Sequence, residues 1–130
     1  EGEFVDNAGR EDLLKVGMIL GPFFMFRKSI LKMTKVFDEQ LVSGADYDLA
    51  LRLAHNGKGM HIPHNSGYYL NEGLGASTRP DSKQPLERTV IEMRYGLDVI
   101  DPRLIPYTNE YDIENIHNGS FKFKARCLVA

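Results

Sequence analysis

The sequence predicts a mixed α/β fold, in which a few short strands form a mixed sheet flanked by helices. Three observations indicate this class. A helix with marked start and end lies between Val36 and Asn65, and residues 86–97 carry a periodic apolar stripe. Residues 23–26 form a short continuous apolar run, which is typical of a buried strand. Three helices and a C-terminal β-hairpin are therefore expected around the sheet.

Length and composition indicate a single domain over residues 1–130. The chain is 42% hydrophobic and 26% charged, which is enough for a modest core. A net charge of -2 gives no basic patch for nucleic acid or an anionic membrane. No apolar run has the length of a membrane span, and the single cysteine, Cys127, excludes an internal disulfide.

The chain is expected to act in the cytoplasm, where any membrane association would come from other parts of a longer protein. The sequence starts at Glu1 and shows neither an initiator methionine nor the basic and apolar regions of a signal peptide, and its last residues are apolar. We therefore expect both ends to be boundaries within a longer chain.

The N-terminal third begins with an acidic lead-in loop over residues 1–10. Residues 11–20 are compatible with a helix or with a buried extended stretch. After Gly21-Pro22, residues 23–26 predict a central strand, and residues 29–35 predict a helix. That helix would lay one apolar face on the sheet, formed by Ile30, Met33 and Phe37.

The central helix is marked at both ends. Ser43-Gly44-Ala45-Asp46 matches the pattern in which a hydroxyl and a carboxylate cap the first backbone N–H groups. Leu49 and Leu53 follow one turn apart, and Asn56-Gly57 supplies a left-handed exit. The pattern predicts a helix of about three turns.

Asp46 and Asp48 open this helix. Residues two apart on a helix point in nearly opposite directions, so the pair does not predict a metal chelate. Asp48 is interpreted as a first-turn acid that complements the helix dipole. Asp46 is either a cap or a catalytic base, since a helix N-terminus favours negative charge.

Downstream, residues 59–63 predict a brief strand, and residues 71–84 predict a loop that is either a mobile lid or a plain connection. Pro85 predicts the first turn of a helix over residues 85–98. Its apolar stripe consists of Leu86, Val90, Met93 and Leu97.

The C-terminal extension, residues 99–130, is predicted to be irregular up to Asn118. Asn118-Gly119 then predicts a hairpin whose second strand alternates apolar and basic residues. An edge strand defended by charge is the simplest interpretation of that strand.

Two histidines, His61 and His64, raise the question of a zinc site. They face opposite sides of an extended strand, and no third histidine or cysteine lies nearby in the sequence. A metal hydrolase built on them therefore stays a minor alternative.

The segment from Gly21 to Ser77 contains several pieces in a recognisable order. They are an apolar run ending in Arg27, a short helix, Phe37-Asp38-Glu39, the Ala45-Asp46-Tyr47-Asp48 helix start, Arg52-Leu53 and Gly57. In order and spacing they resemble the acceptor-binding half of family 2 glycosyltransferases, which are inverting nucleotide-sugar enzymes with the GT-A fold. The resemblance covers a little under half of the chain, residues 21–77.

The resemblance implies that Asp46 is the general base. It also implies substrate contacts from Arg27, Asp38, Glu39, Tyr47, Glu72 and Ser77. Two positions depart from the family pattern, because Ala45 stands where the family usually has Glu, and Glu72 stands where it often has His.

The implied reaction is a single displacement. A carboxylate removes the proton of an acceptor hydroxyl while that oxygen attacks the anomeric carbon of a nucleotide sugar. In the family, Mg²⁺ or Mn²⁺ held by an Asp-x-Asp motif neutralises the leaving diphosphate. No such motif precedes Gly21, so the metal is expected to be bound mainly by residues outside this chain. The isolated chain is expected to be inactive.

The expected partners are a nucleotide-sugar donor and a glycan or lipid-linked acceptor. An exposed sheet edge would also allow pairing between copies of the chain. The main alternative is a non-catalytic sugar- or nucleotide-binding module of the same fold, which Ala45 favours and an intact Asp46 opposes. A scaffold whose edge strand pairs with another protein is a further alternative.

Overall fold

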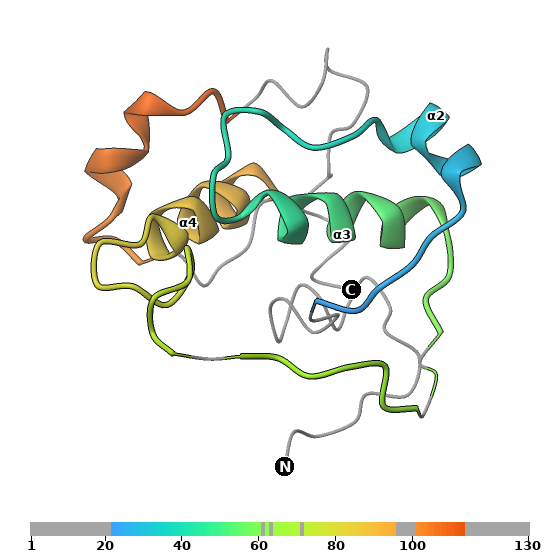
Figure 1. The fold of residues 1–130 in the computed structure, drawn as a ribbon. Coiled ribbons are helices and arrows are strands. Elements are labelled where there is room, and N and C mark those ends of the chain that lie inside the picture. The colour runs from blue at the N-terminus through green and yellow to red at the C-terminus, as the bar shows by residue number, and fades with distance from the viewer. Residues whose placement is uncertain (1–21, 61, 63, 71, 96–100, 114–130) are drawn as a thin grey trace. The chain divides into compact units, whose positions relative to one another are not determined.

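The computed structural model describes residues 22–60, 62, 64–70, 72–95 and 101–113 (Figure 1). These residues group into two compact units. The first lies within Glu1–Val36 and Tyr47–Leu70, and the second lies within Phe37–Asp46 and Asn71–Ala130. The expectation of one domain over residues 1–130 stays a prediction.

All regular structure in the described residues is helical. The elements, in which η denotes a 3-10 helix, are η1 (Lys28–Ile30), α2 (Leu31–Thr34), α3 (Ala45–Asn56), α4 (Gln84–Arg94) and η2 (Ile105–Glu110). The predicted α/β class with a GT-A-like mixed sheet is therefore wrong for this part of the chain. The expected pairing of copies through a sheet edge depended on that sheet. The predicted C-terminal hairpin lies outside the described residues.

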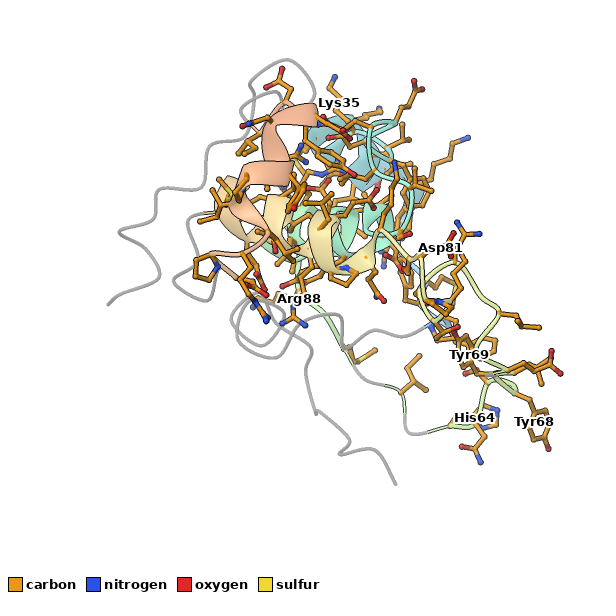
Figure 2. All side chains as sticks on the ribbon, turned by 90° about the vertical axis from the view of Figure 1, so that its left-hand side faces the viewer. Lys35, His64, Tyr68, Tyr69, Asp81 and Arg88 are labelled. Carbon is orange, nitrogen blue, oxygen red and sulfur yellow. The ribbon has the colours of Figure 1, made fainter. Side chains whose placement is uncertain are left out.

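The two segments predicted as strands expose their apolar side chains. Residues 23–26 and the described residues of 59–63 are not in strands, and Met25 and Ile62 are 90% and 62% exposed. A strand is stable only when its backbone groups pair with a neighbouring strand, and composition alone does not supply that neighbour. The same exposure continues to Tyr68, whose side chain points away from the ribbon in Figure 2.

The helix predicted over residues 29–35 is present in a short form, as η1 followed by α2. Lys35 ends it with a positive φ of 61°, while its N–H donates to the Leu31 carbonyl at 2.9 Å. The predicted apolar face is only partly covered, because Met33 is 58% exposed and Phe37 is 50% exposed.

Helix α3 confirms the predicted start and end, since it runs from Ala45 to Asn56 directly before Gly57. Its side chains from Tyr47 to Leu53 are all buried, so this stretch has no solvent-facing stripe. Gly57 lies close to the first short helix, because a Cβ at this position would be 3.1 Å from the Ile30 Cδ1 atom.

Helix α4 confirms the predicted first turn, with Pro85 among its first residues. Its buried face differs from the predicted stripe. Leu86 and Met93 are half-buried, whereas the buried residues include Glu87, Val90, Ile91 and Arg94 at helical spacing. The helix packs against η2, which lies in a segment predicted to be irregular. Predicted stripe residue Leu97 lies outside the described residues.

Candidate functional site

Asp46 lies in the first turn of α3, and its side chain is exposed. The first N–H groups of a helix carry positive partial charge, so an acid at this place is electrostatically favoured. An exposed carboxylate at a helix start is able to reach a ligand, which a buried cap is not. Asp46 is therefore accessible from solvent, and its role as a general base stays a prediction.

The loop directly before α3 is held by a carboxylate from α4. The backbone N–H groups of Val42, Ser43 and Gly44 donate to the Glu87 carboxylate at 2.8, 2.6 and 2.6 Å. Glu87 is fully buried, and the Tyr111 hydroxyl donates to it at 3.3 Å. Because several donors converge on one acid, the conformation of residues 42–44 is strongly constrained.

The surroundings of Glu87 also change the pKa of Tyr111. Burial, together with the negative charge of Glu87 and the hydrogen bond to it, raises the pKa of Tyr111 to about 12. The phenol therefore stays protonated at neutral pH and remains a hydrogen-bond donor to Glu87.

The interior of α3 is fixed by a buried ion pair. Arg52 contacts the Asp48 carboxylate through Nη2 at 2.8 Å and through Nε at 3.0 Å, and the two side chains are 1% and 0% exposed. The same guanidinium donates to the Thr34 carbonyl and, at 2.8 Å, to the Val36 carbonyl. Asp48 thus acts as a partner of Arg52, beyond the dipole role predicted for it.

The Phe37-Asp38-Glu39 turn is anchored through its acid. Gln40 donates from its side chain to Asp38 Oδ2 at 2.8 Å, and Arg94 Nη2 lies 2.9 Å from the same atom. Burial raises the pKa of Asp38, but the hydrogen bonds from Gln40 and the nearby Arg94 charge outweigh it, so that the pKa lies below its ordinary value. This turn is therefore held by charged contacts.

The same cluster ties the turn to the end of the described chain. Gln40 and the backbone of Asp112 exchange two hydrogen bonds, at 3.0 and 2.8 Å. Arg94 donates to the carbonyls of Asp112 and Ile113 at 3.2 and 3.3 Å. One arginine of α4 thus joins two segments that are distant in sequence.

Loop 71–84 contacts the start of α3 within the second unit. The Ser43 hydroxyl lies 3.5 Å from the Ala76 carbonyl, which also accepts a 2.7 Å hydrogen bond from Ser82. Ser77, a predicted substrate residue, directly follows Ala76 in the sequence and so lies next to this contact. Residues 72–83 are non-helical as predicted, whereas Gln84, the predicted end of the loop, is already the first residue of α4.

The remaining predicted substrate residues differ in exposure. Arg27 is exposed at the start of η1, Glu39 and Glu72 are exposed, and Tyr47 is 5% exposed. Asp38 is 9% exposed and engaged by Gln40 and Arg94. Substrate contact by these residues stays a prediction.

Metal ligands do not cluster in the part of the chain that the structure describes, where no group of at least three His, Cys, Asp or Glu side chains could hold an ion. His64 is exposed, and His61 lies outside the described residues. Among the described helices, none combines the length and apolar character needed to cross a bilayer.

Comparisons with protein-family models, with curated proteins and with solved structures give no match for this chain. The candidate site is therefore inferred from the residues of this chain alone. Sequence reasoning placed Asp46 at the start of α3 but missed Glu87, Tyr111 and Arg94, whose partners lie many residues away. The available signal was the presence of Glu87 and Arg94 on the same helical face as Val90 and Ile91.

Proposed function

We propose that this chain provides the acceptor side of an inverting glycosyltransferase, with Asp46 as the general base. The donor would be a nucleotide sugar, and the acceptor would be a hydroxyl of a glycan or a lipid-linked glycan. The proposal concerns the chemistry of the α3 start, since the described residues contain no GT-A-like sheet.

The observation that carries the proposal is the exposed Asp46 carboxylate in the first turn of α3, immediately after a loop held by Glu87. A base must be accessible to the acceptor and fixed in direction. Exposure provides the first property, and the hydrogen bonds from residues 42–44 to Glu87 constrain the backbone that leads to Asp46. The order of motifs from Gly21 to Ser77 adds the reaction class.

In the proposed step, Asp46 accepts the proton of the acceptor hydroxyl as its oxygen forms the new bond to the anomeric carbon. The bond from that carbon to the diphosphate oxygen breaks, and the diphosphate leaves with the electron pair. A general base of this kind contributes a rate factor of about 10² to 10⁴. Charge neutralisation of the diphosphate is assigned to Mg²⁺ or Mn²⁺ bound mainly by residues outside this chain.

The test compares Asp46→Asn with the wild type in the full-length protein in which the chain is expected to act. Asn keeps the size and capping ability of Asp but cannot accept the proton. UDP- and GDP-sugars are supplied with Mn²⁺ and a glycan acceptor mixture, and release of UDP or GDP is measured. We expect turnover to fall at least about 100-fold while thermal stability changes little.

Asp101→Asn is the matched control, since Asp101 is partly exposed and pairs with the neighbouring Arg103 at 2.8 Å. It should keep wild-type turnover. Near wild-type turnover in Asp46→Asn would refute the base assignment and leave capping as the role of the residue. Donor binding without any transfer by the wild type would favour the non-catalytic binding module instead.

A further inference from the structure

Glu87 is a buried acid outside the predicted site. It lies in α4, is fully covered, and accepts hydrogen bonds from residues that are 43 to 45 positions earlier in the chain. Burial of a carboxylate is costly unless donors surround it, and here backbone N–H groups and the Tyr111 hydroxyl do so. These hydrogen bonds therefore compensate for the burial of Glu87 within the second unit.

The three backbone donors are consecutive and stand just before Ala45, the first residue of α3. Fixing the N–H directions of residues 42–44 fixes the backbone path that leads into the helix. Asp46 is the second residue of that helix. The direction in which Asp46 leaves the first turn is thus linked to the position of the Glu87 carboxylate.

Gly44 supports this link by an independent observation. A Cβ on Gly44 would lie 3.2 Å from the Glu87 Cβ and 3.0 Å from the Ile91 Cδ1 atom. A side chain at this position would require Ile91 or Glu87 to shift by a few tenths of an ångström. The loop and α4 therefore meet through both hydrogen bonds and tight packing.

We propose that Glu87 is a positioning residue, which holds the loop before α3 so that Asp46 points at the acceptor. Glu87 itself touches no substrate. This inference rests on the proposed function of Asp46, and it adds a part of α4 to the acceptor side of the site.

The test is Glu87→Gln, which keeps the shape but replaces one acceptor oxygen with an amide that cannot accept. Glu92→Gln is the matched control, because Glu92 lies on the same helix, is 5% exposed and pairs with Arg88 at 2.8 Å. Both variants should lose some stability. We expect only Glu87→Gln to lower kcat, by about 10- to 100-fold, with KM for the donor changed less than about threefold.

Two structural readouts accompany the kinetics. Amide hydrogen exchange of residues 42–44 should accelerate in Glu87→Gln and stay slow in Glu92→Gln. The pKa of Tyr111 should fall from about 12 in Glu87→Gln, because the charge and the charged acceptor are gone, while part of the rise due to burial remains. These readouts need no substrate.

The outcomes separate the two proposals. If Asp46→Asn keeps wild-type turnover, the proposed function fails. If Asp46→Asn is inactive and folded Glu87→Gln keeps wild-type kcat, only the positioning role fails. Should Glu87→Gln not fold, Gly44→Ala perturbs the same contact from the loop side. A fall in its kcat supports the inference, and an unchanged kcat overturns it.

Discussion

Removal of one partner of the buried Asp48–Arg52 pair should destabilise the protein more than removal of both. The two side chains are 0% and 1% exposed, so water screens their interaction very little. Asp48→Leu leaves the Arg52 guanidinium in place without the carboxylate that lies 2.8 Å from it. An uncompensated buried charge costs about 3–5 kcal/mol.

Arg52→Met should cost a similar amount, because it leaves the Asp48 carboxylate without its cation. It also removes the donors to the carbonyls of Thr34 and Val36. Thr34 is 3% exposed, so the loss of its carbonyl partner adds about 1–3 kcal/mol. Val36 is 57% exposed, so the loss of the bond to its carbonyl should cost less than the loss at Thr34.

The double variant, Asp48→Leu with Arg52→Met, removes both charges and keeps most of the volume. We expect it to cost less than either single variant because it leaves neither charge buried alone, and the lost partner of the Thr34 carbonyl contributes about 1–3 kcal/mol to that cost. Denaturant unfolding followed by far-ultraviolet circular dichroism measures all four proteins. Costs that simply add, or an Asp48→Leu cost below about 1 kcal/mol, would refute the reasoning.

Two further predictions concern the second unit. Gly44→Ala should destabilise the protein by about 1–3 kcal/mol in thermal unfolding, because the new methyl group crowds the Ile91 Cδ1 and Glu87 Cβ atoms. Ser43→Ala should cost less than about 0.5 kcal/mol, and equal costs would contradict the packing argument. Because the pKa of Asp38 is lowered in the folded state, Asp38 stabilises the fold at pH values above its ordinary pKa of about 4. This stabilisation is lost as the pH falls through the lower pKa of the folded state. In Arg94→Met the pKa of Asp38 should rise, so unfolding measured from neutral to acidic pH should show a smaller acid-dependent loss than in the wild type. An identical pH dependence in both proteins would contradict this role of Arg94.

The helices could be predicted because their signals are local. Ser43 to Asp46 marks the start of α3, Asn56-Gly57 marks its end, and the structure has Ala45–Asn56. Pro85 marks the first turn of α4 in the same way. Each of these signals depends on residues within one helical turn, which the sequence displays directly.

The strands could not be predicted reliably, because a strand depends on a partner that the local sequence does not show. Phe23 to Phe26 has the composition of a central strand, yet Phe23 and Met25 are 53% and 90% exposed. A continuous apolar run reports a tendency to be covered, but it does not specify what covers it. The 3-10 helix η2 could not be predicted either, because the turn residues of segment 105–110 carry no periodic apolar stripe.

The candidate site combines both cases. The place of Asp46 follows from the local pattern, whereas the role of Glu87 depends on donors at least 43 residues earlier. An apolar stripe that includes Leu86 and omits Glu87 places the buried face of α4 one residue away from its true position. On the true face, Glu87 and Arg94 flank Val90 and Ile91, which are fully buried. Charged residues at buried positions require partners elsewhere in the fold. The presence of Glu87 and Arg94 on the buried face of α4 therefore indicates that this helix holds other segments in place.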